Sequence, residues 1–164
     1  MNDPGNVPHS INEVLAAARA RLDRVQPENL EHERAAGALI IDIRPTEQRN
    51  RDGELPGATV IDRNILEWRL DPASCYHIAE IVGYDPRIVI VCNEGYSSSL
   101  AAAQLQDLGL HRATDLVGGY QGWLTRDRRT ERAAPRNQTA EPITTPRPAR
   151  RTRSWHRRQG STAR

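Results

Sequence analysis

The 164-residue chain contains no lysine and no phenylalanine, so all 23 of its basic residues are arginine. We attribute this usage to coding bias rather than to chemistry. The only cysteines are Cys75 and Cys92, too few for a disulfide framework, and neither has neighbours at the spacing of zinc ligands. No apolar run approaches the roughly 18 residues needed to cross a membrane. These absences argue against a disulfide-stapled domain, a metal site and a membrane-spanning protein.

The N-terminus, "MNDPGNVPHS", lacks the charged and apolar regions of a secretory signal. We therefore expect a cytoplasmic protein that has no membrane partner. In that reducing compartment a lone cysteine remains a free thiol.

Charge is divided unevenly along the chain. Residues 1–125 hold 11 arginines against 18 acidic residues, whereas residues 126–164 hold 12 arginines against 3 acidic residues. The last segment has no hydrophobic periodicity, which predicts a disordered, arginine-rich tail over 127–164. Its stretch "RPARRTRSWHRR" could contact phosphates, but a chain without lysine produces such runs by composition. Nucleic acid is therefore not an expected partner, although a nucleic-acid-binding tail stays open as an alternative.

Helix and strand periodicities alternate between the N-terminus and this tail. Ser10 and Glu13 have the spacing of a capping box, so a helix is expected over 11–25. The other expected elements are helices over 27–37, 97–109 and 120–126, and strands within 38–44, 53–62, 87–92 and 113–119. This alternation predicts an α/β fold, a parallel sheet flanked by helices on both faces. We divide the chain into an N-terminal helical extension (1–26), one domain (27–126) and the tail (127–164).

The loop "CNEGYSS" (92–98) joins the most strand-like segment directly to a helix that begins with serines. Ligands bind beyond the carboxyl ends of parallel strands, which is where Cys92 falls. Such a loop can turn several backbone N–H groups inward, and Gly95 permits the positive φ of a tight curl. A sulfur in this cradle would be stabilised as the nucleophilic thiolate. A buried core thiol ahead of a capped helix stays open as the alternative.

These residues resemble the active-site loop of single-domain rhodaneses, the thiosulfate sulfurtransferases. That loop has the pattern Cys, two variable residues, Gly, one variable residue, then Ser or Thr. Three more segments agree in order: "LIIDIR" is similar to the family's first core strand, "GELPGATVI" to its His-Ile-Pro-Gly-Ala segment, and "DLVGGYQGW" to its closing Gly-Gly…Trp element. The resemblance covers about residues 28–126 and implies a rhodanese-like fold.

The resemblance also implies a sulfurtransferase that needs no cofactor and no metal. Cys92 would be the catalytic residue, taking sulfane sulfur from thiosulfate or a persulfide and passing it to a thiol or cyanide acceptor. The thiol acceptor could be a small molecule or a protein. The donor would be bound by the loop residues Asn93, Glu94, Gly95, Tyr96, Ser97 and Ser98.

The loop departs from the family where Arg or Lys often stands beside the cysteine, because it has Asn93 and Glu94 there. A carboxylate so close opposes both thiolate formation and anion binding. We therefore expect weak thiosulfate activity or a less charged donor, and the alternative is a catalytically weak binding or regulatory module. Phosphate-ester hydrolysis is not expected, because it needs a Cys-x₅-Arg loop and Ser98 stands at the arginine position.

Three charged residues follow strands on the edge where the loop is expected. For Asp42 and Arg44 the main interpretation is an ion pair or hydrogen bonds that fix neighbouring loops, and the alternative is direct substrate contact. Arg63 could reach the same edge and supply the positive charge that the loop lacks, unless it is simply solvated.

Overall fold

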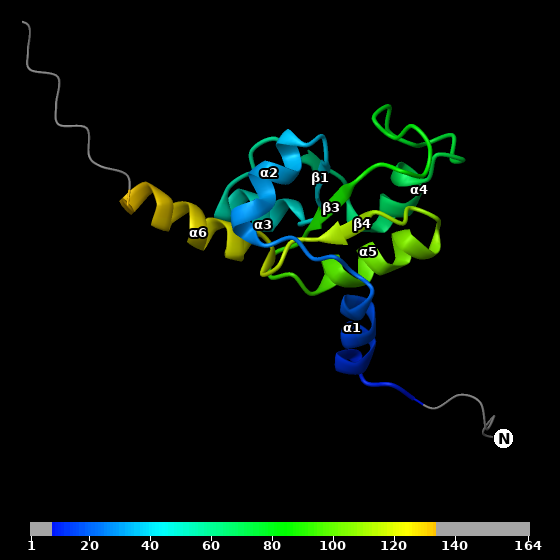
Figure 1. Cartoon of the computed structure of the whole chain (residues 1–164), viewed down its shortest axis with the longest axis horizontal. Helices are drawn as coiled ribbons and strands as arrows, with labels where there is room; N and C mark the ends of the chain where they lie inside the picture. The colour runs from blue at the N-terminus through cyan, green and yellow to red at the C-terminus, as the bar shows by residue number, and fades with distance from the viewer. Residues whose placement is uncertain (1–7, 134–164) are drawn as a thin grey trace, which may run out of the picture. The chain divides into compact units, whose positions relative to one another are not determined.

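The computed structural model describes residues 8–133, which contain one sheet of four parallel strands in the order β2-β1-β3-β4. Figure 1 labels the strands β1, β3 and β4 of this sheet. The strands are β1 (Leu39–Asp42), β2 (Thr59–Val60), β3 (Ile88–Val91) and β4 (Ala113–Asp115). The helices are α1 (Ile11–Ala20), η1 (Pro27–Asn29), α2 (Leu30–Ala35), α3 (Thr46–Asp52), η2 (Arg63–Ile65), α4 (Leu66–Leu70), α5 (Ser97–Asp107) and α6 (Gly119–Ala133). The predicted α/β class is confirmed.

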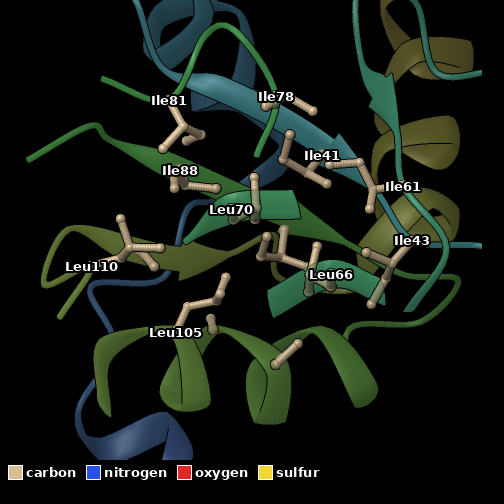
Figure 2. Close-up of a cluster of buried hydrophobic side chains, with 14 of the residues drawn as sticks. Ile41, Ile43, Ile61, Leu66, Leu70, Ile78, Ile81, Ile88, Leu105 and Leu110 are labelled. Carbon is tan, nitrogen blue, oxygen red and sulfur yellow. The ribbon is translucent and has the colours of Figure 1, made fainter. Parts of the chain in front are cut away.

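One face of the sheet packs against α4 and α5. Because successive strand residues point to opposite faces, Ile41, Ile88 and Ile90 share this face. They pack with Leu66 of α4 and Leu105 of α5 in a single buried cluster (Figure 2). Burying a side chain of this size contributes about 1.5–3 kcal/mol. The cluster therefore fixes the position of α5, the helix that follows the cysteine loop.

The opposite face packs against α2 and α6. Ile40, Val89 and Val91 contact Leu30 of α2 and Trp123 of α6 in a second buried cluster. Burial on both faces explains why the central strands are unbroken apolar runs in the sequence. The prediction of helices on both faces is confirmed.

The N-terminal helix has the predicted capping box. The Glu13 carboxylate accepts the Ser10 N–H at 2.7 Å, and the Ser10 hydroxyl accepts the Glu13 N–H at 3.3 Å. The helix ends at Ala20 rather than at the predicted residue 25. The reason is that Val25 forms a parallel bridge with Leu116 at the edge of the sheet beside β4.

Four other helical segments differ from the expectation. The sequence pattern does not reveal α3, which buries no residue and so has no apolar periodicity, nor η2 and α4, which are only three and five residues long. The last helix, α6, continues to Ala133, beyond the predicted limit at 126. The rest of the predicted tail, from residue 134, lies outside the described residues. Among the helices within 8–133, none is long and apolar enough to cross a bilayer.

Candidate active site

Cys92 directly follows β3, which lies between β1 and β4 at the centre of the sheet. The loop 93–96 then leads into α5, which begins at Ser97. The carboxyl ends of β1 and β4 lie on either side, so the segments that follow them flank the loop. This is the edge of a parallel sheet where ligands bind.

Gly95 in the loop and the Gly118–Gly119 pair after β4 let the loop curl tightly. Gly95 has φ of 78°, and a Cβ added to it would lie 2.8 Å from the Gly118 nitrogen. Gly119, at φ of 58°, lies so close that an added Cβ would overlap the Cys92 carbonyl oxygen. The free N–H groups at the start of α6 bind the loop, because Tyr120 donates to the Cys92 carbonyl at 2.8 Å and Gln121 to the Asn93 carbonyl at 3.0 Å. The Gly-Gly segment therefore shapes the cysteine loop, a role that was not predicted from the sequence.

The Cys92 sulfur lies inside this curl, and the residue is only 7% exposed. The Gly95 N–H donates to Sγ at 3.1 Å, and the Ser98 hydroxyl lies 3.2 Å from it. Burial raises the pKa of the thiol, but hydrogen bonds from the Ser98 and Ser97 hydroxyls and from backbone amides outweigh it, so the pKa lies below its ordinary value. The loop thus favours the thiolate, as the sequence predicts.

The serines that begin α5 do not cap it, contrary to the usual role of serine at a helix start. The residue at the N-cap position is Tyr96, which makes no side-chain capping bond. The Ser98 and Ser99 hydroxyls instead turn inward and donate to Asp115 at 3.0 and 2.7 Å. Asp115 is fully buried at the end of β4, and Arg24 forms an ion pair with it at 2.7 Å. A hydrogen-bond chain therefore runs from the sulfur to a buried carboxylate.

Asp42 and Arg44 form a buried ion pair beside the loop. The Arg44 guanidinium donates to the Asp42 carboxylate at 2.7 Å and to the Gly53 carbonyl at 3.0 Å. It also stacks 3.6 Å from the centroid of the Tyr120 ring. These contacts join the segments after β1, α3 and β4, which agrees with the interpretation that the pair fixes neighbouring loops.

A cavity of about 350 Å³ opens over the sulfur. Its lining includes Cys92, Arg44, Asn93, Glu94, Tyr96 and Ser97. The Glu94, Tyr96 and Ser97 side chains are exposed, so they lie at the mouth, and the Asn93 amide oxygen accepts a hydrogen bond from Gln121 at 3.1 Å. The structure therefore gathers the loop residues and Arg44 around Cys92.

Arg63 lies outside this cavity. It lines an adjoining cavity of about 290 Å³ that shares Ile43, Arg44 and Pro45 with the first. Its guanidinium pairs with Glu67 at 2.7 Å and donates to Gln104 at 2.9 Å. Arg63 therefore lines the neighbouring cavity, with its guanidinium held by Glu67 and Gln104.

Two residues of the site, Asp115 and Arg24, were not predicted from the sequence. Asp115 gave a signal, because it is a charged residue among the apolar positions of a predicted strand. Arg24 gave none. As for metals, no three His, Cys, Asp or Glu side chains come close enough to hold an ion within residues 8–133.

The site predicts a pH-dependent reactivity for Cys92. In a Cys75→Ser background, which leaves one thiol, alkylation by iodoacetamide should have its pH midpoint below the value of about 8.5 for free cysteine. The unfolded protein in urea gives the reference midpoint. Because the folded pKa is the lower one, the shift stabilises the fold above the unfolded pKa, and that contribution disappears as pH falls through the folded pKa. Equal midpoints in the folded and unfolded protein would contradict the geometry described above.

Gly95→Ala should destabilise the fold and weaken the cradle. A left-handed alanine costs about 1–2 kcal/mol in free energy of unfolding, and overlap with the Gly118 backbone adds about 1–3 kcal/mol. Gly83→Ala is the matched control, because Gly83 has the same φ of 78° and an added Cβ there meets nothing within 4 Å. Thermal melting of both variants separates backbone strain from overlap, and equal losses would show that the close approach at Gly95 is unimportant.

The fold and the site together define an α/β protein with an acidified thiol in a loop of N–H groups at the carboxyl edge of a parallel sheet. The Rhodanese-like domain family matches residues 26–126. The chain therefore belongs to the rhodanese-like domain family, as the sequence motifs implied.

Named relatives agree with this assignment. The thiosulfate sulfurtransferases GlpE of Stutzerimonas stutzeri and Pseudomonas entomophila are 30% and 32% identical to this chain over 100 residues, which are 61% of this chain and 83% of each relative. The human single-domain sulfurtransferase TSTD1 is similar in structure, with a TM-score of 0.54 and 28% identity over 63% of this chain and 96% of its own.

A second structural neighbour covers more of the chain. It is a Rhodopseudomonas palustris protein of unknown function, described as a possible tyrosine phosphatase. It has a TM-score of 0.66 and 28% identity, and the match covers 77% of this chain and 97% of the neighbour.

Proposed function

We propose that this chain is a sulfurtransferase in which Cys92 carries sulfane sulfur as a persulfide. The observation that supports this best is the position of the Cys92 sulfur, which accepts the Gly95 N–H at 3.1 Å and lies under an open cavity. Membership of the rhodanese-like family and the similarity to thiosulfate sulfurtransferases support this reaction class.

The proposed reaction has two steps, each of which exchanges one sulfur bond. The Cys92 thiolate attacks the outer sulfur of the donor, a new S–S bond forms, and the donor's own bond to that sulfur breaks. Sulfite leaves if the donor is thiosulfate, and a thiolate leaves if the donor is a persulfide. An acceptor thiolate or cyanide then attacks the outer sulfur of the Cys92 persulfide and restores the thiolate, which is ping-pong chemistry. Neither step needs an oxidant, a metal or a cofactor.

The charge of the cavity favours a donor with less charge than thiosulfate. Of the residues that line it, Arg44 is already paired with the buried Asp42, while Glu94 places a carboxylate at the mouth. A dianion must approach that carboxylate, whereas a persulfide carries at most one negative charge on its sulfur. We therefore propose a small-molecule or protein persulfide as the preferred donor, and a thiol as the acceptor.

We also propose a cytoplasmic location, because of the redox state that the sulfur carrier requires. The sulfur carrier must stay a free thiol between turnovers, and a reducing compartment keeps it so. Both cysteines are free thiols in the structure.

Intact mass spectrometry tests the proposal. The full chain is incubated with thiosulfate or with glutathione persulfide, desalted and weighed. The expected result is a gain of one sulfur atom, more complete with the persulfide, that disappears when cyanide or a thiol is added. If neither donor adds sulfur, the enzyme proposal is wrong and the catalytically weak binding module takes its place.

Phosphate-ester hydrolysis is the chemistry suggested by the description of the Rhodopseudomonas palustris neighbour. It is not proposed for this chain, because the position six residues after Cys92 holds Ser98, whose hydroxyl is bound to Asp115. Without an arginine there, the loop has no bidentate partner for a phosphate.

Changing the charge of Glu94 should change the choice of donor. Glu94→Gln removes the charge at nearly constant shape and should speed loading from thiosulfate about two- to fivefold, and Glu94→Arg about tenfold, because one and then two charge units change near the dianion. The gain should shrink as salt is added. Loading from the persulfide of 2-mercaptoethanol, which has no charged group besides its sulfur, is measured in parallel by mass spectrometry and should change much less. Equal acceleration with both donors would contradict the charge argument.

A further inference from the structure

The segment that precedes the rhodanese-like domain is built into the sheet and the helix layer. Residues 10–25 lie outside the family match at 26–126. Yet Val25 donates its N–H to the Asp115 carbonyl at 3.0 Å and accepts the Val117 N–H at 2.8 Å. Leu15 and Ala18 of α1 are buried, and α1 packs against α5. This segment therefore lies beside β4 and α5, the two elements that flank the cysteine loop.

Arg24 neutralises the buried carboxylate that is hydrogen-bonded to the serines of the loop. Its Nε and Nη2 donate to the two oxygens of Asp115 at 2.7 and 3.0 Å, a bidentate pair. Asp115 is fully buried and also accepts hydrogen bonds from Ser98 and Ser99. Ser98 in turn lies 3.2 Å from the Cys92 sulfur. Without Arg24, an uncompensated negative charge would stand one hydroxyl away from the thiolate.

Arg19 and Arg24 also hold the backbone of the loop. Arg19 Nη2 donates to the Gly95 carbonyl at 2.8 Å, and Arg24 Nη2 reaches the same oxygen at 3.3 Å. The Arg19 guanidinium lies 5.3 Å from the centroid of the Tyr96 ring. In a trans peptide the C=O and N–H point in opposite directions. A Gly95 carbonyl held toward the arginines therefore turns the Tyr96 N–H to the opposite side of the loop.

We propose that this N-terminal segment completes the active site, with Arg19 and Arg24 as positioning residues for Cys92. Arg19 fixes the loop backbone through the Gly95 carbonyl, and Arg24 offsets Asp115 so that Ser98 can donate to the sulfur. When Cys92 is a thiol, it donates to Ser98, which donates to Asp115. When Cys92 is a thiolate, the Ser98 hydroxyl turns to it, and Asp115 keeps its bonds from Ser99 and Arg24. This inference rests on the proposed function of Cys92 as the sulfur carrier.

The charges of Arg24 and Asp115 have opposite effects on the stability of the Cys92 thiolate. The charged and titratable groups around Cys92, from the loop, the N-terminal segment, β1, β4 and α6, are Glu94, Tyr96, Arg19, Arg24, Asp42, Arg44, Asp115 and Tyr120. Removing the cation of Arg24 disfavours the thiolate, whereas removing the anion of Asp115 favours it. A purely structural ion pair would lower stability in both variants and would give no such opposition.

The test is the pH dependence of Cys92 alkylation in the full chain with Cys75→Ser. Arg24→Gln should slow alkylation below the midpoint about tenfold, which corresponds to one pH unit, and Asp115→Asn should speed it. The double variant should return toward the wild-type midpoint. Arg19→Gln should slow alkylation about threefold, because it removes the shortest of the side-chain hydrogen bonds to the Gly95 carbonyl. Arg21→Gln is the matched control, since Arg21 is the C-cap residue of α1 and lies between Arg19 and Arg24 in the sequence, but it pairs with Asp107 of α5 at 2.5 Å. The alkylation midpoint of this variant should not move.

Shifts of the same sign in Arg24→Gln and Asp115→Asn, or none, would overturn the inference. If Asp115→Asn does not fold, the comparison of Arg24→Gln and Arg19→Gln with Arg21→Gln decides alone, and equal midpoints in all three refute it. Alkylation requires no sulfur donor, so its outcome is independent of the proposed function. A chain that loads no sulfur but shows the opposed shifts would refute the sulfurtransferase while retaining the role of the segment.

Discussion

A Cys92→Ser variant is expected to take up no sulfur from thiosulfate or from glutathione persulfide, a complete loss relative to the wild type. The serine hydroxyl is not ionised at neutral pH and forms no persulfide, so the first step has no nucleophile. The fold should survive, because a hydroxyl can keep the hydrogen bonds that the sulfur makes with Gly95 and Ser98. Intact mass spectrometry after incubation with each donor measures the loss, and circular dichroism checks the fold.

Cys75→Ser is the matched control for that variant. Cys75 is exposed, whereas Cys92 is buried in the loop. Replacing Cys75 should therefore leave the mass gain of one sulfur atom on loading unchanged. If Cys92→Ser still gained one sulfur and Cys75→Ser did not, the carrier would be Cys75 and the proposed site would be wrong.

The sequence predicts those parts of the site whose determinants are local. Cys92 stands at the end of an apolar strand, and Gly95 supplies the positive φ that the curl requires, so both could be placed from a seven-residue loop. The sheet was predictable for a similar reason, since strands buried on both faces are continuous apolar runs.

The network behind the loop could not be predicted in this way. Arg24 and Asp115 are 91 positions apart and meet only because Val25 pairs with the strand segment beside Asp115. An arginine after an amphipathic helix gives no signal of its own, since most such residues are solvated. The serines show the same limit, because their helix-start positions suggest caps, while a buried carboxylate elsewhere in the chain draws two of them inward.

The buried pair of Asp42 and Arg44 is expected to have the largest effect on stability. Asp42→Ala leaves the Arg44 charge inside the protein, where both side chains are at most 1% exposed. Removing one partner of such a pair costs about 3–5 kcal/mol in free energy of unfolding. The loss includes the anchor of the Arg44 backbone N–H, which donates to the Asp42 carboxylate at 2.9 Å. Urea unfolding followed by circular dichroism measures the change.

An exposed pair provides the comparison that separates burial from pairing. Asp107→Ala breaks the ion pair with Arg21, in which the Arg21 side chain is 45% exposed and the Asp107 side chain 65% exposed. Because the pair is exposed, its loss should leave the unfolding midpoint nearly unchanged. Asp42→Asn keeps the shape and an acceptor for the Arg44 N–H while removing the charge, so it should fall between wild type and Asp42→Ala. If Asp42→Ala lowered the free energy of unfolding no more than Asp107→Ala, Arg44 would be bound by water or by another residue in that variant. The pair of Asp42 and Arg44 would then not be what holds the loops around the Cys92 cavity.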